Sequence, residues 1–99
     1  MASSDHSVKR VLQAVADPTR RRILQVLKER GSNSNDRSSG LCASDIEQKV
    51  KVAQPTVSHH MRVLKNAGLI EAKKQGQWIW YRRNERAIAE FARNLRDVL

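Results

Sequence analysis

The segment that most constrains this chain is QPTVSHHMRVLKN, at residues 54–66, because it predicts a short helix with two chemically different faces. Val57, Met61 and Leu64 recur at helical spacing and form one apolar stripe. Another face carries hydroxyl, imidazole, guanidinium and ammonium groups, which are the groups that meet phosphates and base edges in nucleic acids. These side chains are Ser58, His59, Arg62 and Lys65.

The positive charge of the chain is concentrated around this helix and the segment after it. The 99 residues carry a formal net charge of +9, and residues 51–83 hold seven basic side chains and one acidic side chain. Such a patch attracts polyanions and speeds encounter with them. The length suits one small domain with a limited core, which pairing with a second copy would enlarge.

Two helices are predicted before the loop at residues 31–40. The first covers residues 7–16, and its apolar stripe consists of Val8, Val11, Leu12 and Val15. Asp17 is a good N-cap and Pro18 is tolerated at a first helical position, so a second helix should begin there and end at Gly31. Residues 31–40 contain no apolar side chain, which predicts a mobile surface loop inside the single domain, residues 1–99.

Residues 44–66 have the pattern of a helix-turn-helix unit. The sequence from Ser44 to Glu47 matches a capping box and should begin a short helix that ends near Val50. After a connection of about three residues, Pro55 should occupy the first position of the next helix, and Gly68 should end it.

The hydrophobic period then changes to that of strands. Residues 69–83 alternate around Gly76 and predict a two-stranded hairpin, or wing. Its aromatic residues are expected to pack the hairpin onto the domain rather than to stack on bases: Trp78, Trp80 and Tyr81. Asn84 can cap a last helix, at residues 85–99.

The apolar stripe of this last helix runs to the C-terminus, and an exposed stripe of this length usually marks a partner surface. We expect the first and last helices to build a two-fold homodimer, although the last helix could instead fold onto its own domain. The predicted interface residues are Val8, Val11, Leu12, Val15, Ile88, Phe91, Ala92, Leu95 and Leu99.

With these segments in hand, the chain resembles the ArsR/SmtB family of winged helix-turn-helix repressors. The matching stretches are AVADPTRRRIL (14–24), QPTVSHHMRVLKNAGLI (54–70) and GQWIWYRRN (76–84). The resemblance implies a mainly α fold with five helices and a two-stranded wing. It also implies a homodimer that binds an imperfect palindrome in an operator, blocks transcription and is released by an effector.

In this reading, double-stranded DNA is the partner. The helix at 54–66 enters the major groove, and the helix before it contacts the DNA backbone. The wing contacts phosphates or the minor groove. The apolar stripe favours His59 over His60 as the histidine that faces DNA. Arg82 and Arg83, at the end of the second wing strand, are expected either to contact the DNA backbone or to balance charge. The candidate contacts are Gln54, Thr56, Ser58, His59, His60, Arg62, Lys65, Lys73, Lys74, Gln75 and Gln77.

The resemblance also raises the question of a metal sensor. Family members of one type carry two cysteines one residue apart at the third helix, and here Cys42 is followed by Ser44 at the second position. The last helix has no histidine for the family's other site, so no metal or cofactor is expected. Two minor alternatives are a zinc site of Cys42 with Asp5 and His6, and a redox role for the Cys42 thiol.

Other classes of function fit the sequence less well. There is no catalytic triad, paired carboxylate site or glycine-rich phosphate loop, so an enzyme is not expected. The main rival is a protein-interaction module that uses the apolar face of helix 85–99 and binds DNA only weakly. A single cysteine and the lack of a long apolar run or a signal peptide indicate a cytoplasmic protein without disulfides or membrane spans.

Overall fold

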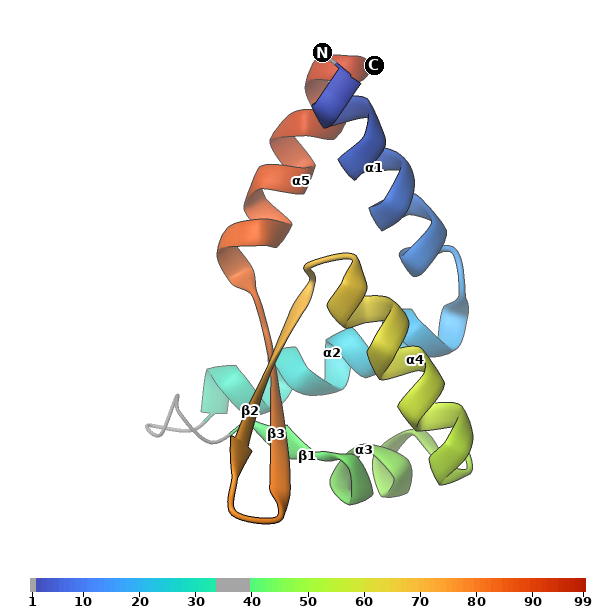
Figure 1. The fold of residues 1–99 in the computed structure, drawn as a ribbon, viewed down its shortest axis with the longest axis vertical. Helices are drawn as coiled ribbons and strands as arrows, with labels where there is room; N and C mark the ends of the chain where they lie inside the picture. Colours follow the sequence, from blue (N-terminus) through green and yellow to red (C-terminus); the bar gives the residue numbers. More distant parts are fainter. Residues whose placement is uncertain (1, 34–39) are drawn as a thin grey trace.

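Five helices and three short strands make up the described part of the chain (Figure 1). The computed structural model describes the backbone of residues 2–33 and 40–99 and the side chains of residues 8–29 and 40–99. The order of elements is α1 (Ala2–Val15), α2 (Pro18–Asn33), β1 (Leu41–Cys42), α3 (Ala43–Val50), α4 (Gln54–Asn66), β2 (Ile70–Gln75), β3 (Trp78–Arg83) and α5 (Glu85–Val98). This is the predicted winged helix-turn-helix fold, with one strand more than expected.

The sheet is antiparallel and has the strand order β1-β3-β2. The hairpin β2–β3 pairs Ile70 with Arg83 at its base and Gln75 with Trp78 at its tip. The prediction of a two-stranded hairpin therefore missed one strand of the sheet, because β1 pairs two residues with the other edge of β3. Leu41 from this strand is buried, so β1 ties the segment before α3 to the core.

Two of the predicted helix starts are confirmed, and two need correction. Asp17 caps α2, since its Oδ2 accepts from the backbone N–H of Arg20 at 2.9 Å, and Asn84 caps α5 in the same way through Ala87. The N-cap of α3 is Cys42 instead of Ser44. Ala53 is the N-cap of α4, which moves Pro55 to the second helical position.

The end of α4 is as predicted, but the end of α2 is not. Gly68 has a φ of +79°, and hydrogen bonds from Gly68 to Lys65 and from Leu69 to Leu64 form a Schellman motif. In contrast, α2 continues through Gly31 to Asn33. The loop prediction is thus wrong for residues 31–33, and its remaining part, residues 34–39, lies outside the described residues.

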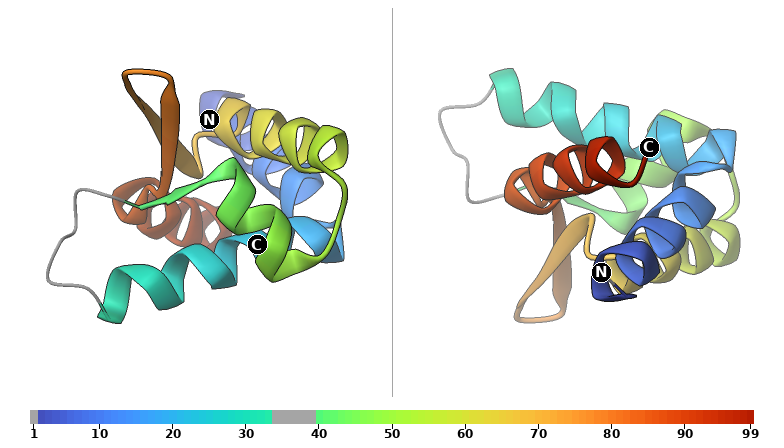
Figure 2. Two further views of the ribbon diagram at one scale, coloured as in Figure 1. Left: turned by 90° about the horizontal axis from the view of Figure 1, so that it is seen from below. Right: turned by 90° about the horizontal axis from the view of Figure 1, so that it is seen from above.

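The core lies between α1, α2, α3 and α4, and buried residues of β1 and β2 join it. Ile23, Ile46, Val57 and Leu64 are fully buried there, and each contributes about 1.5–3 kcal/mol by leaving water. Figure 1 shows α1 and α5 converging at the end of the molecule that carries both termini. The tip of the wing and the N-terminal end of α4 lie at the opposite end in Figure 1. In the view from above in Figure 2, α1 and α5 are accordingly nearest and the wing is more distant and fainter.

Candidate nucleic-acid interface

The helix α4 separates its apolar and polar side chains as the sequence predicts. Val57, Met61 and Leu64 are buried and fix the helix on the core. All but one of the predicted contact residues of this helix are exposed. The exposed residues are Gln54, Thr56, Ser58, His59, Arg62 and Lys65. The outward face of α4 therefore presents polar and basic side chains to solvent.

The exception is His60, which the structure removes from this surface. Its side chain is 9% exposed, and its Nδ1 lies 3.2 Å from Nη1 of Arg20 in α2. The neighbouring ring of His59 is exposed. Of the two histidines, only His59 is thus placed where it can face a ligand of α4, which agrees with the preference that the apolar stripe gave.

The wing places four polar candidates around its turn. Lys73, Lys74 and Gln75 at the end of β2 and Gln77 in the turn are all exposed. Trp78 is 52% exposed, so the prediction that it packs the hairpin onto the domain is wrong. Trp80 is half-buried, and only Tyr81 packs against the core cluster.

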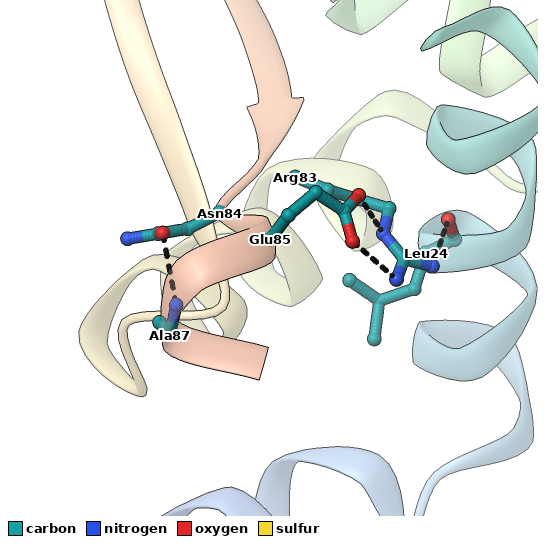
Figure 3. A network of polar contacts seen from close by, with 5 residues as sticks. All are labelled: Leu24, Arg83, Asn84, Glu85 and Ala87. Carbon is teal, nitrogen blue, oxygen red and sulfur yellow. Dashed lines mark hydrogen bonds and ion pairs between the residues drawn. The ribbon is translucent and has the colours of Figure 1, made fainter. Parts of the chain in front are cut away.

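Arg82 and Arg83 have internal partners. Arg82 pairs with Glu71 across the hairpin at 2.8 Å, with both side chains about half exposed. Arg83 is 14% exposed, pairs with Glu85 at 2.8 Å, and donates to the carbonyl oxygen of Leu24 at 3.5 Å (Figure 3). Arg83 thereby joins β3, α5 and α2, which is a structural role that the sequence pattern did not indicate.

The predicted dimer surface divides into covered and open residues. Val8 and Val11 are buried within the single chain, so these two predictions are corrected: α1 uses this face to pack on its own domain. Val15, Ile88 and Phe91 pack partly against the core, and Leu95 is half-buried. Leu12, Ala92 and Leu99 remain exposed, and Leu99 is 95% exposed.

Cys42 is buried at the start of α3. Its Sγ lies 3.2 Å from Oγ of Ser44 and 3.1 Å from Oδ2 of Asp45. Among the described residues there is no group of three or more potential metal ligands. The side chains of Asp5 and His6 lie outside the described residues, so the zinc alternative stays a prediction. No helix in the described ranges is both long and apolar enough to span a membrane.

Fold and surface together define a winged helix-turn-helix protein with one exposed polar helix face and one exposed wing that carries lysines. Comparison with known proteins agrees. Residues 17–72 match the family model described as bacterial regulatory protein, arsR family. The chain therefore belongs to this family and is a DNA-binding transcriptional regulator, which favours this reading over the interaction module.

Individual relatives cover most of the chain. An uncharacterized HTH-type transcriptional regulator of Methanocaldococcus jannaschii is 41% identical over 71 residues, which are 72% of this chain and 71% of that protein. The transcriptional repressor SdpR of Bacillus subtilis is 34% identical over 80 residues, 81% of this chain and 79% of its own. A homodimeric winged helix-turn-helix DNA-binding domain from Mycobacterium bovis superposes with a TM-score of 0.74 at 27% identity, covering 92% of this chain and 77% of the other.

Proposed function

We propose that this chain is a homodimeric repressor that binds a palindromic operator with α4 in the major groove and the wing on the flanking backbone or minor groove. One observation carries the proposal. The N-terminal end of α4 and the tip of the wing, which both carry exposed candidate contacts, lie at one end of the molecule, away from the end where α1 and α5 meet (Figure 1). Two copies joined at the α1–α5 end can therefore present two such surfaces to one duplex.

The contacts of α4 follow from the chemistry of its exposed side chains. Gln54 can pair with adenine, and Arg62 can pair with guanine or a phosphate. Ser58 and Thr56 can bond to phosphates or to base edges. His59 can donate or accept from the same face. The wing lysines, Lys73 and Lys74, bind phosphates without regard to sequence.

The dimer part of the proposal is supported by open apolar side chains on α1 and at the C-terminal end of the chain. Leu12 is 44% exposed, Val98 40% and Leu99 95%, and none of the described residues of α5 is fully buried. Two copies that cover these side chains would remove apolar surface from water. The relative from Mycobacterium bovis is homodimeric, and SdpR is a repressor. The proposal includes no cofactor and no catalysis, and it expects the protein to act in the cytoplasm.

The proposal is tested by selecting bound duplexes from a random pool with the full chain. The expected product is a two-fold symmetric motif whose half-sites lie about one helical turn apart. The double variant Ser58→Ala/His59→Ala should lose the preference for this motif and remain dimeric by sedimentation. The matched control Gln25→Ala/Lys28→Ala changes two exposed residues of α2 and should keep the preference. Unchanged selectivity of the first variant would contradict the assigned surface.

A further inference from the structure

The side chain of Arg20 joins three helices at the flank of α4 that faces away from the proposed DNA surface. Its Nε donates to the carbonyl oxygen of Ala14, and its Nη2 donates to that of Gln13 at 3.2 Å, both in the last turn of α1. Its Nη1 contacts Nδ1 of His60 in α4 at 3.2 Å. The backbone N–H of the same residue is held by the Asp17 carboxylate.

The direction of the contact with His60 is fixed by chemistry. A guanidinium has five N–H donors and no acceptor, so Nδ1 of His60 must accept and must be free of a proton. The ring is then neutral, with its hydrogen on Nε2. A second proton would place an N–H on Nδ1 facing the N–H groups of Arg20, and it would add a positive charge beside a permanent one.

From this geometry we infer that Arg20 and His60 are a positioning pair, which holds α4 in its DNA-binding orientation and releases it when His60 is protonated. The inference rests on the proposed function and names a regulation of the same surface. Neither residue contacts DNA in this arrangement. Arg20 acts through His60, and His60 acts through the helix that carries Ser58 and His59.

The groups around His60 favour its neutral form. Burial lowers the pKa of His60, the carboxylate of Asp17 opposes this effect, and the charges of Arg20 and His59 lower the pKa further. The Arg20 guanidinium and the Asp17 carboxylate come from the start of α2. His59 lies on α4 itself, and its ring centroid is 5.6 Å from that of His60. From α1, Arg10 donates to the carbonyl oxygen of Asn66 at 3.4 Å at the far end of α4.

Protons can reach the pair from solvent. Arg20 borders an open depression that Arg10, Gln13, Ala14, Val63 and Asn66 also line. Protonation should thus follow the bulk pH in the mildly acidic range, below the ordinary pKa of histidine. The affinity for DNA should fall with it.

Three forms of the full chain separate positioning from simple packing, and all keep His59 and His6, so that the differences between them report on position 60. The first is the unchanged chain. The second carries His60→Asn, whose side-chain oxygen can accept from Arg20 near the position of Nδ1 and does not titrate. The third carries His60→Leu, which fills the space and accepts nothing.

Binding to the selected operator duplex is measured by fluorescence anisotropy between about pH 5.5 and pH 8 at fixed ionic strength, with circular dichroism as the check on folding. The unchanged chain should lose about tenfold in affinity toward acid pH, as expected for a hydrogen bond that involves a charged group. The His60→Asn variant should match its affinity at pH 8 and stay nearly constant. The His60→Leu variant should bind about tenfold more weakly at every pH while folded.

A nuclear magnetic resonance titration of the ring nitrogens gives a readout that packing alone would not set. Nδ1 of His60 should show the signal of an unprotonated acceptor at neutral pH and gain a proton as affinity falls. A pH profile that is unchanged by His60→Asn, or a proton on Nδ1 at neutral pH, would overturn the inference and leave the proposed function intact. If none of the three forms binds a duplex at any pH, both the proposed function and this inference fail.

Discussion

Leu41 lies opposite Tyr81 in antiparallel register, so a strand of two residues connects the start of the helix-turn-helix unit to the wing. Gly40 precedes this strand with a φ of +60°, and a Cβ at this position would overlap the carbonyl oxygen of Tyr81. The close approach of the two strands therefore depends on the missing side chain. It also makes the orientation of the wing dependent on the segment that leads into α3.

Replacing Gly40 with alanine should therefore destabilise the protein more than the same change in the wing turn. Gly76 also has a positive φ, +62°, but nothing lies within 4 Å of a Cβ there. Each substitution costs about 1–2 kcal/mol for the left-handed backbone, and Gly40→Ala should cost about 1–3 kcal/mol more through the steric overlap. Urea unfolding measures both free energies, and equal losses would show that β1 does not pack as described.

Asp17 predicts a dependence of stability on acid pH. The hydrogen bond from the backbone N–H of Arg20 is the main cause that lowers the pKa of Asp17 in the folded protein. The stabilisation is present above the ordinary pKa of an aspartate and is lost as the pH falls through the folded value. Asp17→Asn keeps a capping oxygen without titrating, so its free energy of unfolding should fall less between about pH 5 and pH 2. Parallel pH curves for the two proteins would contradict this assignment.

Local signals in the sequence predicted much of this fold. The bounds of α4 follow from its apolar stripe and from Gly68, whose left-handed conformation the chain needs at that point. Asn84 likewise marks the start of α5 by a hydrogen bond within the same turn. The prediction that α2 ends at Gly31 was wrong, because a glycine only weakens a helix by about 1 kcal/mol and need not end it.

Features that depend on distant contacts were not predictable in this way. The strand β1 is two residues long, too short to show a period, and its partner lies in the wing. The apolar stripe favoured His59 as the outward-facing histidine, but it gave no sign that His60 would meet Arg20 of α2. Val8 and Val11 fit a dimer stripe as well as a core stripe, and only the packing of α1 distinguishes the two.

The two tryptophans should report on engagement of the wing. Both lie in β3, and Trp78 is exposed beside the turn that carries the proposed phosphate contacts. If the wing approaches DNA, the emission of Trp78 should change as a duplex is added, because its environment becomes less aqueous. The change should persist in Trp80→Phe and disappear in Trp78→Phe. A spectrum that stays constant at saturating DNA would place the wing away from the duplex.

The wing lysines should contribute to the salt dependence of binding rather than to its sequence preference. The affinity should fall linearly on a logarithmic plot against salt, with a slope near −0.9 for each phosphate neutralised. Lys73→Gln/Lys74→Gln should therefore make this slope shallower by about one for each phosphate that a lysine no longer neutralises. The exposed Lys28 of α2 supplies the control, since Lys28→Gln should leave the slope unchanged. If Lys28→Gln changed the slope half as much as the double substitution, net charge alone would govern binding.

Two copies of this chain should bind one duplex through α4 and the wing. Sedimentation equilibrium of the purified protein, alone and with a duplex from the selection at low ionic strength, measures both the oligomeric state and the stoichiometry. We expect a dimer without DNA and a complex of two protomers on one duplex, which should dissociate as salt is raised. A monomer that binds no double-stranded DNA at low salt would contradict this arrangement.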